Sequence, residues 1–312
     1  MKLCSLVAFC LFVLVGIAAI AQEPPSDTKH GIMVRVAQIY VSPDASSARL
    51  GEVTRGREVF ITDQSREWVH VMASLGGQKN LTGWILDKGI IRINTPDGDK
   101  ILFGEGAASE LEASDRRGRK GAAEDARRLY YRVFDYFPAS PLAGEGLYRA
   151  ADIFWQLGGT HRGNGESTMD DPNNPHQLAE ETMKLVTKKF PGTKWADMAA
   201  FHLLDLKLCD DWLGESKCPE KEADVYEKYA YDRPDSPNAA EALYDAAKRR
   251  AALIEIYKTE NKSKQSDESM GKAKADCAAI ISKYPQSDWA YRARTLVYML
   301  EQGIPTYGNA QQ

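Results

Sequence analysis

The stretches YFPASPLAGEGLYRAA, from Tyr136 to Ala151, and KFPGTKWADMAAFHLL, from Lys189 to Leu204, share one order of residue types. In each, an aromatic residue and a proline precede a serine or threonine, and an alanine then opens an apolar run. Two further copies begin at Pro234 and Pro285, so the pattern Pro-x-[Ser/Thr]-x-x-Ala occurs four times. Internal repetition of this kind indicates a protein built from stacked supersecondary units.

Each part of the repeat has a mechanical role at a turn between two helices. The residue before a proline avoids the helical conformation, so the preceding helix tends to end there. The serine or threonine can accept a hydrogen bond from a free backbone N–H at the start of the next helix. The four residues predicted to begin helices in this way are Ser140, Thr193, Ser236 and Ser287.

The helix before each proline carries its own pattern, in which small and large residues alternate at helical spacing. The residues eight positions before the four prolines are Tyr130, Met183, Tyr226 and Cys277, and those twelve positions before are Ala126, Ala179, Glu222 and Ala273. Because residues four apart lie on one face of a helix, we expect these positions to pack against a neighbouring helix. Glu222 is the exception to the apolar pattern.

This pattern resembles the tetratricopeptide-repeat (TPR) family, whose second helix also ends in Ala-x3-aromatic-x7-Pro. The likeness is to its periplasmic members associated with outer-membrane assembly and the Tol-Pal system, and it covers residues 121–303. The prolines are 53, 43 and 51 residues apart, whereas the family repeat is about 34 residues. We expect the extra residues at the ends opposite the proline turns, within Gly158–Pro175, Asp210–Lys217 and Thr259–Asp267.

The resemblance also implies which residues face a partner, because the helix after each proline lines the concave side of such a solenoid. The partner-binding residues expected on this basis are Arg149, Trp195, Met198, His202, Trp289 and Arg292. Their mixture of aromatic, apolar and charged side chains suits an interaction surface. The alternative is that so short a stack folds its groove onto the chain's own linker.

Residues 31–93 have a different pattern, in which short β-branched runs are divided by turn residues. Trp68-Val69-His70-Val71 alternates as a half-buried strand does, and about five strands are expected. Together with IYVSPDAS, REWVHV and TGWI, this resembles the bacterial SH3-like (SH3b) domains, which implies a small barrel that binds cell-wall peptides or protein segments. Tyr40, Trp68 and Trp84 are the ligand candidates, although so small a barrel favours Trp68 and Trp84 as its core.

Residues 94–120 contain NTPDGDK, GEGAAS and SDRRGRKGA, whose Gly, Pro and charged residues predict a hinge between the two domains. Residues 304–312 are expected to form a tail. The fold class expected from all of this is a multidomain chain, in which a small all-β SH3-like barrel is followed by an all-α TPR-like solenoid of helical hairpins.

The first 21 residues predict a secretory signal peptide. Lys2 precedes an apolar run from Leu3 to Ile20, and small residues flank the end of that run. The alternative is an uncleaved inner-membrane anchor, because about 18 apolar residues can just span a bilayer. A cleaved signal peptide predicts a periplasmic or secreted protein, and an uncleaved one predicts a protein anchored in the inner membrane.

In an oxidising compartment Cys209 and Cys218 could form a local disulfide, or remain free thiols as we expect of Cys277.

Composition and motifs argue against several other functions. The chain has 40 basic and 44 acidic residues and a net charge of −4, so neither its charge nor its motifs indicate a nucleic-acid partner. No histidine spacing matches a metal motif, although His161, Asp170, Asp171 and His176 share one polar loop. No catalytic constellation or cofactor motif is found, and neither a metal nor a cofactor is predicted.

The sequence therefore predicts a non-enzymatic scaffold or adaptor of the cell envelope. It would bind protein partners, or cell-wall peptides, through the SH3-like module and the TPR-like groove. The alternative is an accessory or activator of a cell-wall hydrolase, with the barrel binding peptidoglycan. Membrane contact is expected only through an uncleaved N-terminal segment.

Overall fold

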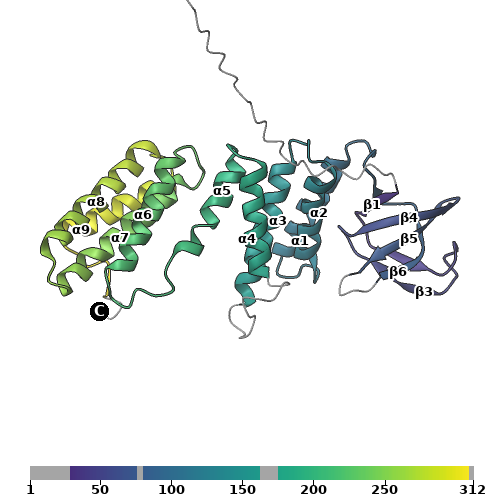
Figure 1. Cartoon of the computed structure of the whole chain (residues 1–312), viewed down its shortest axis with the longest axis horizontal. Coiled ribbons are helices and arrows are strands. Elements are labelled where there is room, and N and C mark those ends of the chain that lie inside the picture. Colours follow the sequence, from purple (N-terminus) through teal and green to yellow (C-terminus); the bar gives the residue numbers. More distant parts are fainter. Residues whose placement is uncertain (1–28, 76–79, 162–174, 309–312) are drawn as a thin grey trace, which may run out of the picture.

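The computed structural model describes residues 29–75, 80–161 and 175–308. A β-domain at one end of the molecule is followed by helices α1 to α5 and then by helices α6 to α9 (Figure 1). The predicted order of a β-domain followed by a helical domain is confirmed. The predicted signal peptide lies outside the described residues, and within them no helix is long and apolar enough to span a membrane.

The β-domain is one curled antiparallel sheet in the order β3-β2-β6-β5-β4-β1-β7. Seven strands are described where about five were predicted, because the short strands at the chain ends of the domain also pair. The inner face is packed with apolar residues such as Val59, Val71 and Ile85, all fully buried. The strands are β1 (His30–Met33), β2 (Ala37–Tyr40), β3 (Arg49–Val53), β4 (Glu58–Ser65), β5 (Trp68–Ser74), β6 (Asn80–Leu86) and β7 (Ile90–Ile91).

The helical domain consists of antiparallel neighbours in which each helix packs on the next. All four predicted capping residues lie at helix starts, where their hydroxyl oxygens accept from backbone N–H groups at 3.1–3.3 Å. The helices are α1 (Gly98–Ser114), α2 (Ala122–Tyr136), α3 (Ala143–His161), α4 (Pro175–Lys189), α5 (Lys194–His202), α6 (Lys217–Asp232), α7 (Ala239–Thr259), α8 (Ser263–Lys283) and α9 (Asp288–Glu301), with a 3-10 turn at Asp205–Lys207.

The predicted packing positions eight and twelve residues before each proline are buried without exception. Glu222 is buried as well, because its carboxylate accepts from the backbone N–H of Cys209 at 3.0 Å and from Arg249 Nε at 3.1 Å. A buried charge is tolerated when its hydrogen bonds are satisfied in this way. Glu222, the exception in the sequence pattern, therefore links helices α6 and α7 to the loop before α6.

The predicted hinge at 94–120 is wrong for most of its length. Helix α1 occupies residues 98–114, and Leu102 is fully buried against α2. The packed face of α1 is made largely of small residues: a Cβ on Gly106 would lie 2.9 Å from the Tyr130 ring, and Ser109 is fully buried. Small residues let helices approach closely, but in a sequence they look like a loop. The helical domain therefore begins at Gly98.

The two domains share an apolar core. Ile32 and Ile91 of the sheet pack in one cluster with Leu102 of α1 and with Leu129 and Val133 of α2. The turn before β4 also approaches α2 closely at Gly56. Its φ is +73°, and a Cβ there would lie 2.4 Å from Arg128 Cβ and 2.9 Å from the Leu129 backbone nitrogen. The β-domain is therefore docked on the helices.

The segments expected to hold the extra residues of each repeat differ in structure. In the second, a disulfide joins Cys209 and Cys218, whose Cα atoms are 6.1 Å apart, and the tail residue Tyr307 packs its ring 5.6 Å from that of Trp212. In the third, α7 and α8 are 21 residues each, so longer helices take up most of the excess. Cys277 is a buried free thiol, as predicted.

A buried ion cluster joins helices α6, α7 and α8. Arg250 is 3% exposed, and its Nε donates to Asp276, also 3% exposed, at 3.2 Å. The same guanidinium contacts Glu227 and lies 3.4 Å from Asp224. Burial and the charge of Glu227 raise the pKa of Asp276 to about 7, although Arg250 opposes this.

The close approach at Gly56 can be tested against a glycine with the same backbone. Gly56→Ala is expected to lower the free energy of unfolding by roughly 2–4 kcal/mol, from left-handed strain plus the clash with α2. Gly192 has a φ of +74° but open space around it, so Gly192→Ala should cost only about 1 kcal/mol. Urea denaturation measures both. Equal losses would show that the domain contact is not tight.

The Asp276 carboxyl should make stability depend on pH. Its folded pKa lies above the unfolded value of about 3.9, so between these values the native state holds a proton that the unfolded chain has released. The contribution of Asp276 to stability should therefore fall as pH rises from about 4 to 7, by about 1.4 kcal/mol per pH unit at most. The urea midpoint of Asp276→Asn should not show this fall with pH, whereas the midpoint of the exposed Asp232→Asn variant should show it as wild type does. Parallel curves for all three proteins would contradict the prediction.

Candidate functional site

The outer face of the β-sheet carries a continuous row of aromatic and apolar side chains. Residues directly opposite each other in an antiparallel pair share a face, and the register pairs Trp68 with Leu86, His70 with Trp84, and Phe60 with Met72. Tyr40 lies opposite Trp84 on its other side. We call these residues the outer aromatic row: Tyr40, Phe60, Trp68, His70, Met72, Trp84 and Leu86.

The row brings together the three aromatic residues predicted from the sequence. The Tyr40 ring meets Trp68 edge-on with centroids 5.5 Å apart, and Trp84 lies 5.1 Å from His70. Neither tryptophan belongs to the inner apolar core of the sheet. Trp68 is nonetheless 8% exposed, whereas Trp84 remains half-buried. Trp84 is therefore the better placed of the two to contact a ligand.

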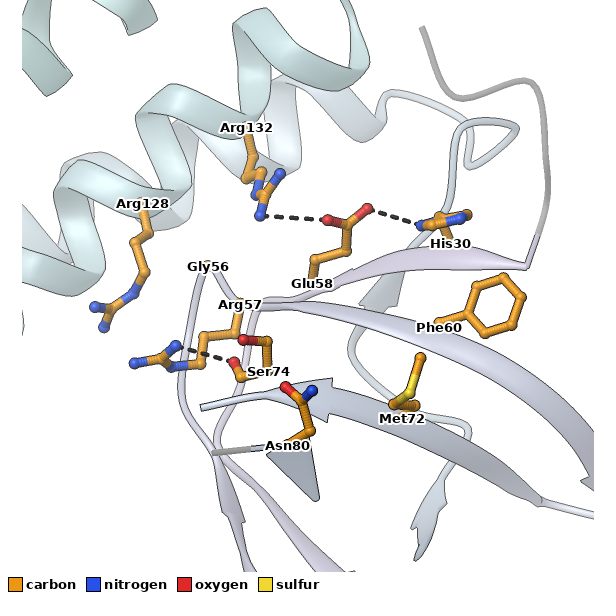
Figure 2. Close-up of a pocket in the computed structure, with 10 residues that line it drawn as sticks. All are labelled: His30, Gly56, Arg57, Glu58, Phe60, Met72, Ser74, Asn80, Arg128 and Arg132. Carbon is orange, nitrogen blue, oxygen red and sulfur yellow. Dashed lines mark hydrogen bonds and ion pairs between the residues drawn. The ribbon is translucent and has the colours of Figure 1, made fainter. Parts of the chain in front are cut away.

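The outer face is divided between this row and the helices. At one end, Ile32 and Ile91 are covered by α1 and α2. At the boundary between the covered and uncovered parts lies a pocket of about 390 Å³, which we call the junction pocket (Figure 2). It is lined by His30, Gly56, Arg57, Glu58, Phe60, Met72, Ser74, Asn80, Arg128 and Arg132.

The acidic residue of the junction pocket is fully engaged. Glu58 contacts His30 Nδ1 at 2.9 Å and Arg132 at 3.5 Å, and it accepts from the Tyr136 hydroxyl at 2.5 Å. Burial raises the pKa of Glu58, but the hydrogen bond from Tyr136 and the charge of Arg132 outweigh it, so the net shift is downward. Glu58 therefore remains ionised and fastens the sheet to α2.

The three arginines of the pocket differ in their partners. Arg128 pairs with Asp125 and donates to the Arg55 carbonyl at 3.1 Å, and Arg132 pairs with Asp135 as well as with Glu58. Arg57 donates instead to neutral oxygens, those of the Ser74 carbonyl at 3.0 Å and the Thr54 hydroxyl at 3.2 Å. Among the described residues no carboxylate lies within ion-pair distance of Arg57.

The helical residues predicted to face a partner are separated by the structure. Trp195 stacks on Tyr148 at 5.6 Å, and His202 lies beside Tyr148 and Trp155. Met198 packs in the same cluster between α3 and α5. We call this the α3–α5 cluster.

The other predicted helical residues lie elsewhere. Trp289 contacts Tyr244 of α7 at 5.3 Å, and Arg292 stands over Trp289 at 4.6 Å. Arg149 pairs with Glu145 and with Glu110 of α1. The predicted set therefore forms separate clusters rather than one described groove.

Metal binding and cysteine reactivity can be assessed for the residues that the structure describes. Among them, no group of His, Cys, Asp and Glu side chains could hold a metal ion. The side chains of the polar loop with His161, Asp170, Asp171 and His176 lie outside the described residues. Burial raises the pKa of the Cys277 thiol to about 12, which keeps it protonated and a poor nucleophile.

No family model matches the chain, and no curated protein matches it.

The different exposure of the two tryptophans can be tested by truncation. Trp68→Ala should lower the free energy of unfolding by about 3–5 kcal/mol, because it removes a buried ring. Trp84→Ala should cost at most about half as much, since part of its ring already contacts solvent. Chemical denaturation of the full chain measures both. Equal costs would mean that Trp84 serves as core and is a poor candidate for a ligand contact.

Proposed function

We propose that this protein is a non-enzymatic scaffold or adaptor of the cell envelope. In this proposal the β-domain is an SH3-like barrel and the helices form a TPR-like stack. The observation that carries the proposal is the outer aromatic row, which stays partly open while helices α1 and α2 cover one end of the same sheet face. The domains act together because they are docked through one apolar core.

The composition of the row supports polypeptide binding. Amphipathic rings offer large contact area with few rotatable bonds, and aromatic residues and methionine are enriched at interfaces. Met72 is 46% exposed and Leu86 is 36% exposed, so an apolar side chain of a partner would lose contact with water there. The α3–α5 cluster and the Trp289–Arg292 pair supply further surfaces for the same partner or for a second one.

The location rests on the sequence of the first 21 residues and on the Cys209–Cys218 disulfide, which persists in oxidising compartments. The alternative function uses the same surface. Aromatic rings also stack on sugar rings, so an accessory of a cell-wall hydrolase would bind peptidoglycan through Trp84 and its neighbours. The two functions differ in the ligand of the aromatic row, which is a polypeptide in the first and peptidoglycan in the second.

A capture experiment separates these functions. The full chain is incubated in parallel with insoluble peptidoglycan and with solubilised envelope proteins under cross-linking, using wild type and Trp84→Ala. A scaffold should yield defined protein cross-links that fall at least tenfold in Trp84→Ala, with little protein retained on peptidoglycan.

The control is Tyr231→Ala, which removes an exposed ring of α6 far from the sheet. It should behave as wild type. Retention on peptidoglycan that is lost in Trp84→Ala would favour the hydrolase accessory instead. If neither the protein cross-links nor the retention on peptidoglycan changes in Trp84→Ala, a binding role for the aromatic row is refuted.

A further inference from the structure

We propose that the junction pocket binds a carboxylate of the peptide that lies on the outer aromatic row, and that Arg57 is the residue that recognises it. This inference rests on the proposed function, because it assumes that the row binds polypeptide. It adds the chemical class of the partner, which is a segment with an acidic group next to apolar side chains.

The bonding of Arg57 is the first support. A guanidinium has five N–H donors, and those of Arg57 reach one carbonyl and one hydroxyl oxygen among the described residues. Arginine pairs with a carboxylate through two parallel hydrogen bonds, and such charge-assisted bonds are about twice as strong as neutral ones. Arg57 therefore has donors and charge left for an anion, and it lines the pocket (Figure 2).

The charges around Arg57 are the second support. Partial burial and the positive charge of Arg128 lower the pKa of Arg57, and Asp125 only partly offsets them. An arriving carboxylate would relieve this repulsion. Glu58 does not compete for Arg57, because His30, Arg132 and Tyr136 already engage it. Arg128 and Arg132 are paired with Asp125, Asp135 and Glu58, so Arg57 is the pocket arginine that keeps no carboxylate partner among the described residues.

The apolar wall of the pocket is the third support, and it favours a peptide over a bare anion. Phe60 and Met72 line the pocket and also begin the outer aromatic row. His70 follows on the same face, two residues along β5 from Met72 or about 7 Å away, and Trp84 lies opposite His70 on β6. That distance matches the spacing of alternate side chains in an extended peptide. A carboxylate at Arg57 therefore places neighbouring apolar side chains over the row.

The experiment begins with selection from a displayed library of random dodecapeptides on the full-length protein. The most enriched peptide that contains Asp or Glu is then synthesised, together with versions in which the acid is replaced by its amide or the C-terminus is amidated. Fluorescence anisotropy gives the Kd of each version for wild type, Arg57→Gln and Asn80→Asp.

The control is Arg66→Gln. Arg66 is exposed at the turn between β4 and β5, at the other end of that hairpin from the pocket. Wild type should bind the acidic peptide about tenfold more tightly than a version lacking the critical carboxylate, and Arg57→Gln should abolish the preference. Arg66→Gln should keep it. Asn80→Asp adds a negative charge at an exposed lining residue and should weaken only the acidic peptide, even if Arg57→Gln is unstable.

The outcomes distinguish this inference from the proposed function. Selected peptides that lack acids, or a preference for the acid that persists in Arg57→Gln, would overturn the carboxylate site while peptide binding stood. Peptides whose binding is indifferent to Arg57 but lost in Trp84→Ala would do the same. Failure of wild type to enrich any peptide would overturn both. Whether side-chain or C-terminal amidation removes the preference tells which carboxylate is bound, and either supports the site.

Discussion

The packing of helices α1 and α2 onto one end of the outer sheet face is the constraint on which the rest of the molecule depends. Ile32 and Ile91 would be exposed on an isolated β-domain, and Leu102, Leu129 and Val133 would be exposed on an isolated helical stack. Burying the two sets against each other removes both from water. The contact also fixes a polar boundary around Glu58, where Tyr136 and Arg132 bond across the domains.

This docking decides which part of the sheet is available to a partner. The covered end cannot bind anything else, so the aromatic row from Phe60 to Trp68 is left as the free part of the face. It also builds the junction pocket from the sheet and α2, neither of which could form it alone. A hinge at this position would have left the β-domain and the helices independent, whereas the docked arrangement holds them in one orientation.

The sequence predicted the parts of this structure that are set by neighbouring residues. The proline turns and their caps at Ser140, Thr193, Ser236 and Ser287 follow from backbone chemistry within a few positions. Helix α1 was missed because its buried face uses Gly106 and Ser109, whose value lies in the close approach of Tyr130. That partner is distant in the chain, so local composition gives no sign of it.

The candidate site shows the same division. Alternation along the strand around Trp68 was visible in the sequence, and with it the aromatic residues of the row. The cross-strand register that places Trp84 beside His70 and Met72 beside Phe60 was not visible in the sequence. Arg57 could not be singled out, because a surface arginine and one left without a carboxylate in a pocket look alike until their neighbours are placed.

The position of the pocket gives the docking a further consequence. Arg57 belongs to the β-domain, while Arg128 and Arg132 belong to α2, so these lining residues come together only while the domains are docked. A ligand that contacts both sides of the pocket would bind the docked state and not the separated one. By linkage it would stabilise the junction by RT ln(1 + L/Kd), where L is the free ligand concentration. Ligand binding in the pocket and docking of the β-domain on the helices are therefore thermodynamically coupled.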